Sequence, residues 1–166
     1  LIEGLNDENR ESRLAAVQAV GLIGAKSAGA RLKEIVENSD FSNERLAATI
    51  AMGLIGDTEA IPLLKDLLED DEPNIQWDAA VALAKMGDPS GAFIIENLMD
   101  RHYLNAFPQV DEAEKNQAIL VAIEVSSLLK QDRFETKLVS LAESDENLRI
   151  RDAAIKTLQS AYNRVI

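Results

Sequence analysis

A pattern of apolar, small and polar positions recurs along the chain at a nearly constant spacing. In residues 43–57, an arginine and a leucine are followed by two alanines and then by the sequence Gly-Leu-Ile-Gly. Residues 13–24 repeat this order closely, and residues 76–88 repeat it more loosely. The glycines that close the three units are 32 and 31 residues apart: Gly24, Gly56 and Gly87. Self-similarity at a fixed period of this size is the sequence signature of stacked-repeat proteins.

Within each unit the apolar residues are spaced as on one face of an α-helix. The first unit is expected to bury Leu14, Val17, Val20 and Ile23, and the next helix to bury Leu32, Ile35 and Val36. Gly24 is a natural helix end, because glycine tolerates the left-handed backbone conformation that closes many helices. The pattern therefore predicts short helices joined by tight turns.

The starts of later helices are marked by proline and by acidic capping residues. Pro73 is predicted to be the first residue of a helix. Asp111 and Glu114 form a capping-box pattern for a helix that runs to about Lys130, and Asp132 with Glu135 forms a second one. Between these starts, residues 101–110 break the period and are expected to be a longer connection.

These signals predict about nine full helices and the remnant of one more at residues 1–5, with no strand. A single helix pair cannot bury both of its faces, so stacking must supply the core. The expected fold is all-α, a right-handed α-α superhelix (solenoid) of about four and a half helix pairs in a single domain over residues 1–166. The predicted repeats are 1–25, 26–57, 58–88, 89–130 and 131–166. Because the chain starts at Leu1 inside an apolar pattern, it is expected to be a fragment of a longer protein.

The repeated unit resembles the HEAT-repeat family, in particular the short subtype rich in alanine and glycine that also occurs in phycobilisome bilin lyases. A hallmark of that family is an aspartate in the turn, followed six residues later by an arginine of the inner helix. The resemblance implies a ladder of structural Asp–Arg pairs. Its members here are Asp7 with Arg13, Asp40 with Arg45 at a spacing of five, and Asp145 with Arg151. Such repeats serve many unrelated roles, so the resemblance implies a fold and leaves the function open.

Composition excludes several classes of function. The formal net charge of −12 opposes binding to nucleic acid and to anionic membranes. No apolar run approaches the roughly 18 residues of a membrane span. The chain has no cysteine and a single histidine, His102, and it has no phosphate-binding or metalloprotease motif. We therefore predict a protein without catalytic activity, cofactor or metal, and expect it in the cytoplasm.

Residues for binding a partner are predicted in two places. Trp77 is the one tryptophan, and either packs in the core or lies exposed on the concave face. The connection over residues 101–110 supplies the other candidates: Arg101, His102, Tyr103 and Phe107. Acidic residues in successive turns, among them Asp7, Asp40 and Asp70, are expected to line one edge of the stack.

The prediction from sequence is thus a non-catalytic scaffold that binds a protein or peptide, of basic character, on its concave inner-helix surface. One alternative is a subunit similar to a bilin lyase, which would hold a tetrapyrrole with Arg101 and His102. The other is a structural spacer within a longer polypeptide.

Overall fold

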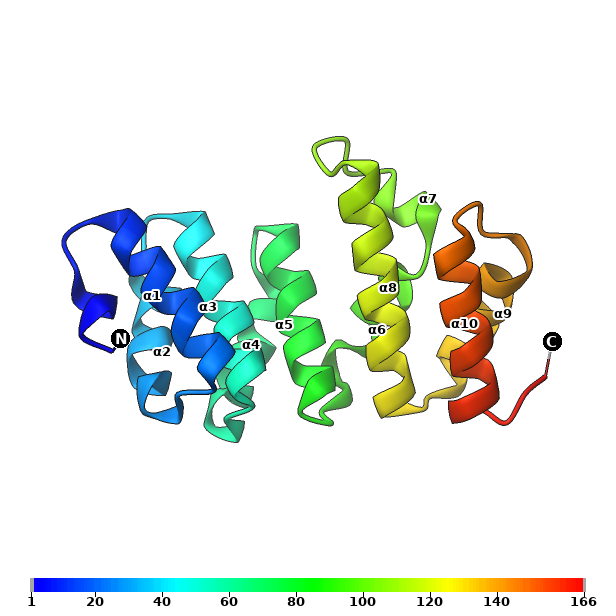
Figure 1. Cartoon of the computed structure of the whole chain (residues 1–166), viewed down its shortest axis with the longest axis horizontal. Helices are drawn as coiled ribbons and strands as arrows, with labels where there is room; N and C mark the ends of the chain where they lie inside the picture. Colours follow the sequence, from blue (N-terminus) through cyan, green and yellow to red (C-terminus); the bar gives the residue numbers. More distant parts are fainter. Residues whose placement is uncertain (1, 166) are drawn as a thin grey trace. The chain divides into compact units, whose positions relative to one another are not determined.

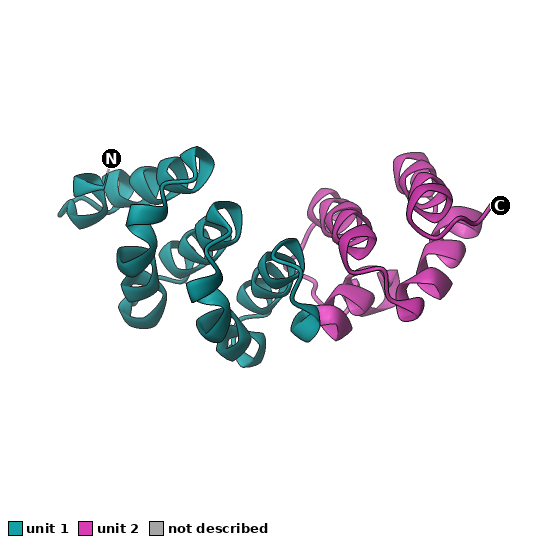
Figure 2. Ribbon diagram, turned by 90° about the horizontal axis from the view of Figure 1, so that it is seen from below, with its two compact units in different colours: residues 1–91 teal, residues 92–166 magenta. Residues whose placement is uncertain are grey.

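The structure, a computed structural model, describes residues 2–165, and these form ten α-helices and five short 3-10 helices with no strand. The chain divides into two compact units, residues 1–91 (unit 1) and residues 92–166 (unit 2), which Figure 2 shows in teal and magenta. Each unit consists of helix pairs. The predicted all-α solenoid is therefore confirmed, whereas the single domain over the whole chain stays a prediction.

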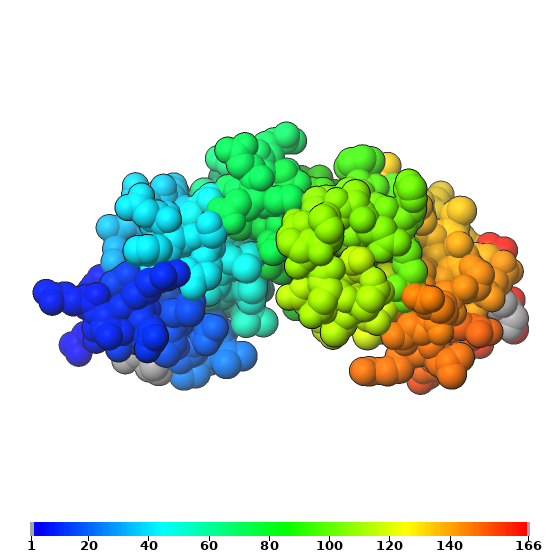
Figure 3. Space-filling view, turned by 90° about the horizontal axis from the view of Figure 1, so that it is seen from above, coloured from blue at the N-terminus to red at the C-terminus, as the bar shows by residue number. Residues whose placement is uncertain are grey.

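Unit 1 contains five α-helices in two layers. Its helices are α1 (Arg10–Ile23), α2 (Gly29–Asn38), α3 (Ser42–Ile55), α4 (Ile61–Asp66) and α5 (Pro73–Lys85). Its 3-10 turns are Glu3–Asn6, Lys26–Ala28, Thr58–Ala60, Leu67–Glu69 and Pro89–Gly91. The longer helices α1, α3 and α5 lie side by side as an inner row, and α2 and α4 form the outer layer (Figure 1). In the space-filling view, the blue, cyan and green segments of this unit follow one another in sequence order, as stacking requires (Figure 3).

The helix boundaries predicted at Gly24 and Pro73 are confirmed, whereas the helix remnant predicted at residues 1–5 is a 3-10 turn at Glu3–Asn6. The side chain of Asn9 accepts a hydrogen bond from the amide of Ser12 and so caps α1. Helices α1 and α3 end at glycines in the left-handed conformation, Gly24 with φ 71° and Gly56 with φ 66°. Pro73 is the first residue of α5, where its missing N–H costs nothing.

Two glycines set how closely the inner helices approach. A Cβ atom placed on Gly21 would lie 2.8 Å from the backbone of Ala51, and one on Gly53 would lie 2.7 Å from the side chain of Ala82. Both distances are shorter than real side chains tolerate, so only glycine fits. The small residues that the sequence repeats are therefore the contact points between neighbouring inner helices.

The core of unit 1 lies between the inner and outer helices. Val17, Val20 and the predicted apolar face of α2 are buried there, together with Leu64 and Leu83. The prediction that Ile23 belongs to this core is wrong, because its side chain is 66% exposed. Ile23 is the last residue of α1 and lies next to the turn at Gly24, where the helix ends.

Unit 2 is built in the same manner from five further helices. They are α6 (Ala92–Leu98), α7 (Arg101–Leu104), α8 (Glu112–Leu129), α9 (Asp132–Ser144) and α10 (Leu148–Ala161). The capping box of Asp111 and Glu114 is present, and α8 ends one residue before Lys130. The second predicted box is absent, because Asp132 is already the first helical residue and Gln131 precedes it as the cap. The short helix α7 lies within the predicted connection.

Candidate protein-binding surface

The inner helices of unit 1 leave one side uncovered by other helices of this unit. Residues three and seven positions apart lie on one face of a helix. Adding 32 to a residue number in α1 gives the equivalent residue in α3, and adding a further 31 gives the one in α5. None of the nine residues found in this way is buried. We call them the inner face: Ala15, Gln18 and Leu22 on α1, Ala47, Ile50 and Leu54 on α3, and Asp78, Val81 and Lys85 on α5.

Aliphatic side chains on the inner face are exposed to solvent. Leu22 is 78% exposed, Leu54 is 45% exposed and Ile50 is 41% exposed. Leu54 reaches over the contact between α1 and α3, since its Cδ1 atom lies 3.6 Å from a Cβ position built on Gly21. These side chains thus lie on neighbouring helices along one face, and apolar groups gathered in this way are typical of binding surfaces.

A small hollow separates α3 from α5 on this face. Its volume is about 100 Å³, and it is lined by Ile50, Gly53, Leu54, Asp78, Val81, Ala82 and Lys85. The walls are mostly aliphatic, and the two charged groups come from α5. A hollow of this size accommodates one side chain of a partner, well below the roughly 300 Å³ of a small-molecule site.

The carboxyl group of Asp78 lies half-buried in this hollow. Burial raises the pKa of Asp78 to about 6, and the charge of Lys85 opposes that rise only in part. Within residues 2–165, no donor forms a hydrogen bond or ion pair with this carboxylate. Asp78 is therefore an acidic group that has lost much of its water without gaining a partner.

Exposed carboxylates also precede each inner helix of unit 1. Asp7 and Glu8 precede α1, Asp40 precedes α3 and Asp71 precedes α5, and all four residues are exposed. Since α1, α3 and α5 run in the same direction, these turns lie at the same end of the three helices (Figure 1). We call these four residues the acidic edge.

Arginines join successive repeats, but in a different way from the predicted ladder. Arg13 donates to the backbone carbonyls of Asp7 and Glu8, at 2.9 and 3.0 Å, and pairs with Glu44 of the next repeat at 2.7 Å. The carboxylate of Asp7 accepts the amide of Asn9 instead. The backbone carbonyls of the turn thus accept hydrogen bonds from the arginine, and the acidic partner is a residue of the next inner helix, α3.

Arg45 also pairs with acidic residues of the next repeat, and it makes no pair with Asp40. Its guanidinium donates to the carbonyl of Val36 and pairs with Asp70 and Glu72 of the next repeat. Asp40 itself is exposed and has no hydrogen bond or ion pair with another described residue. The predicted pairing of Asp40 with Arg45 is therefore corrected.

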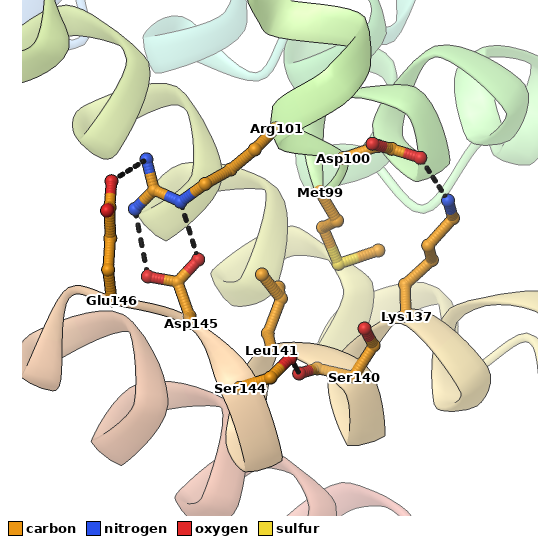
Figure 4. A pocket seen from close by; sticks show the side chains of 9 residues that line it. All are labelled: Met99, Asp100, Arg101, Lys137, Ser140, Leu141, Ser144, Asp145 and Glu146. Carbon is orange, nitrogen blue, oxygen red and sulfur yellow. Dashed lines mark hydrogen bonds and ion pairs between the residues drawn. The ribbon is translucent and has the colours of Figure 1, made fainter.

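In unit 2 the partner of Asp145 is Arg101 rather than Arg151. Nε and Nη2 of Arg101 donate to the two carboxylate oxygens of Asp145, at 2.7 and 2.8 Å (Figure 4). Although burial acts to raise the pKa of Asp145, the hydrogen bonds from Arg101 and the Asn147 amide outweigh it and lower that pKa. Arg151 is exposed and acts on Asp145 only through its charge.

The other predicted binding residues of the 101–110 connection lie around α7. His102 is exposed, and its amide donates to Asp100. Tyr103 and Phe107 are half-buried and meet edge to face, with ring centroids 5.2 Å apart. Both rings therefore take part in holding the connection in place. Their role in binding a partner stays a prediction.

Trp77 is buried, with 8% of its surface exposed. Of the two interpretations that the sequence left open, packing in the interior is the correct one. As a buried residue of α5, Trp77 cannot offer its ring to a partner. It therefore leaves the set of candidate contact residues.

The hollow beside Arg101 is polar, and its two cationic side chains are already paired with carboxylates. It measures about 310 Å³ and is lined by residues of α7, α9 and the adjoining turns, including Lys137, which pairs with Asp100 at 2.6 Å (Figure 4). Arg101 also approaches Glu112 and Glu146, each at 3.7 Å. Both cations in this hollow thus have acidic partners within the unit.

The described residues contain neither a cluster of metal ligands nor a helix suited to a membrane. No group of three or more histidine, aspartate or glutamate side chains among residues 2–165 is placed to hold a metal ion. In the same part of the chain, no helix combines the length and apolar character that crossing a bilayer demands.

Comparison with known proteins agrees with this architecture. Residues 30–103 match the family model described as HEAT repeats. These residues carry HEAT repeats. A solved structure of the complex of CpcE and CpcF of phycocyanin lyase from Nostoc sp. PCC7120 contains a chain of the same fold, with a TM-score of 0.74 and 19% sequence identity. The likeness covers 98% of this chain and 64% of the Nostoc chain. A comparison with curated protein sequences finds no match.

The sequence predicts binding on the inner helices but does not single out the residues of the inner face. In the sequence Leu22 and Leu54 belong to the repeat pattern, and that pattern gives Asp78 no role. Aligning the HEAT repeats would have found Asp78, because the equivalent positions are Ala15 and Ala47. A charged residue that replaces alanine at a repeated surface position is a signal for function.

Proposed function

We propose that this HEAT-repeat protein is a non-catalytic binding module that holds a protein or peptide on the inner face of unit 1. The observation that carries the proposal is the exposure of Leu22, Ile50 and Leu54 on adjacent helices of one face. Burying such side chains against a partner supplies binding free energy, because each one leaves water. The expected compartment for this role is the cytoplasm.

The charge of the chain favours a partner with basic character. The formal net charge is −12, and the acidic edge lies at the ends of the same helices that carry the inner face. Complementary charge speeds the encounter of two proteins and orients them, while the aliphatic contacts supply most of the affinity. A partner segment with aliphatic residues and nearby lysine or arginine fits both features.

The test starts from a displayed library of short peptides tiled from the proteome of the organism that encodes the chain. Peptides selected on the wild-type protein are then measured against Leu54→Gln and against the matched control Ile23→Gln, which alters an exposed aliphatic residue outside the inner face. We expect Leu54→Gln to weaken binding about tenfold or more. Binding that Leu54→Gln leaves unchanged, or a selection that yields no peptide, contradicts the proposal.

A second candidate function is a role similar to a phycocyanin lyase subunit, and the shared fold with the Nostoc chain favours it. Such a role needs cations for the propionate groups of a tetrapyrrole. Arg101 is already paired with Asp145, and the hollow beside it also holds the ion pair of Lys137 with Asp100. The charges of this hollow therefore oppose the second candidate. Mixing the protein with a free bilin tests it, because a bound pigment shifts its absorption spectrum and an unbound one does not.

A further inference from the structure

Asp78 occupies a position of the inner face where the preceding repeats carry a methyl group. Its equivalents are Ala47 on α3 and Ala15 on α1. The last position of the inner face differs as well, because Lys85 on α5 is equivalent to Leu22 on α1 and Leu54 on α3. The third repeat thus places a charged group within a surface that is otherwise aliphatic.

The surroundings of Asp78 leave its charge uncompensated. From α3 it faces Ile50, Gly53 and Leu54, which carry no ionisable group. On α5 the charged group that acts on it is Lys85. Lys85 acts through its charge alone, without a hydrogen bond to Asp78, and its side chain is exposed. A carboxylate with little water and no donor is unfavourable, and a donor supplied from outside relieves that cost.

We propose that Asp78 receives a lysine or arginine side chain of the bound protein, while aliphatic neighbours of that cation pack on Ile50 and Leu54. This inference rests on the function proposed above and names its recognition chemistry. The hollow between α3 and α5, at about 100 Å³, has room for the tip of one such side chain. The ion pair formed there is shielded from water by aliphatic walls, which makes it selective for a cation.

Other uses of this carboxyl group fit the site less well. A metal ion needs several oxygen ligands, and within residues 2–165 no cluster of acidic side chains surrounds Asp78. A general base needs a nucleophile or substrate group beside it, whereas the neighbours of Asp78 in the hollow are aliphatic residues, Gly53 and Lys85. A cationic side chain is the ligand that matches one carboxylate within aliphatic walls.

The proposal predicts that binding depends on pH. The pKa of Asp78 is raised to about 6 in the free protein, so the carboxylate is mostly charged at neutral pH and mostly protonated near pH 5. The charged group that faces it is Lys85, whose charge acts to lower the pKa of Asp78. A cation on the partner favours the charged carboxylate, and its affinity must therefore fall as the pH drops through about 6.

The experiment uses the peptides selected on the wild-type protein, restricted to those without histidine, aspartate or glutamate. Each peptide is paired with a twin in which glutamine replaces the lysine or arginine. Both are titrated against wild type, Asp78→Asn and Leu54→Gln, at about pH 7.5 and about pH 5. Circular dichroism confirms that each variant keeps its helix content.

We expect the cationic peptide to bind wild type about tenfold more tightly than its twin at the higher pH, and to lose most of that preference at the lower pH. Asp78→Asn should remove both the preference and its pH dependence. If the cationic peptide and its twin bind alike, or if Asp78→Asn keeps the preference, the inference about Asp78 is overturned while the proposed function stands. If Leu54→Gln has no effect, the proposed function itself fails.

Discussion

Arg101 donates two parallel hydrogen bonds to Asp145, from Nε at 2.7 Å and from Nη2 at 2.8 Å, and so joins the start of α7 to the turn before α10. The side chain of Asp145 is only 1% exposed. The bridge therefore has the planar, two-pronged geometry in which arginine binds carboxylates most strongly. In unit 1, Arg13 joins consecutive repeats through a single hydrogen bond from Nη2 to Glu44, at 2.7 Å.

Removing the guanidinium of Arg101 is predicted to destabilise unit 2. Arg101→Gln leaves the buried carboxylate of Asp145 without its cation, and breaking a buried pair in this way costs about 3 kcal/mol. Hydrogen exchange of the amides in α8, α9 and α10 reports the change within unit 2. The matched control is Arg149→Gln, which alters an exposed arginine of α10 that is distinct from this bridge. Equal protection in the two variants would show that the bridge adds nothing.

The same bridge predicts how unit 2 responds to acid. The pKa of Asp145 is lowered in the folded protein, so its contribution is present above the ordinary pKa and is lost as the pH falls through the lowered one. In Arg101→Gln this acid-labile contribution is lost, so the variant should be less stable than wild type at neutral pH, and the difference should shrink as the pH falls through the lowered pKa. Hydrogen exchange of unit 2 at several pH values measures this difference. A difference of the same size at neutral and acidic pH would contradict the assignment.

The close approach of the inner helices predicts that Gly53→Ala destabilises unit 1. Alanine is the better helix former by about 1 kcal/mol, so propensity alone would stabilise the protein. The new Cβ would lie 2.7 Å from Ala82, however, and overpacking of this kind costs about 1–3 kcal/mol. Chemical denaturation followed by the fluorescence of Trp77 measures the balance. Gly29→Ala is the control, because its Cβ meets only the side-chain oxygen of Asp57, at 3.3 Å. A Gly53→Ala variant more stable than wild type would refute the packing argument.

Asp78→Asn is predicted to stabilise the free protein at neutral pH. The pKa of Asp78 rises from 3.8 to about 6 on folding, so its contribution to stability is fully present below 3.8 and is lost as the pH rises through about 6. Asparagine removes the cost of charging this group, and partial exposure to solvent limits the gain to about 1–2 kcal/mol. Urea denaturation at about pH 7.5 should show the gain, and at about pH 4 it should vanish. A gain of the same size at both pH values would mean that the charge is not its cause.

The helices could be predicted from the sequence because their boundaries depend on local residue types. The contacts between repeats were harder to predict. Gly24 and Pro73 mark boundaries through backbone geometry that their own residue type dictates. The partner of Arg45 is set by how the next repeat stacks, which the sequence spacing to Asp40 does not encode. For the same reason Trp77 left two interpretations open. Burial depends on which neighbours surround a helix, and these come from distant parts of the chain.

The most direct test of the central claim is a methyl NMR titration of the protein with a selected cationic peptide. Binding on the inner face predicts that the methyl signals of Leu22, Ile50, Leu54 and Val81 shift as peptide is added, and that those of Ile23 stay in place. Shifts confined to exposed leucines of unit 2, Leu128 and Leu148, with none on the inner face, would contradict it.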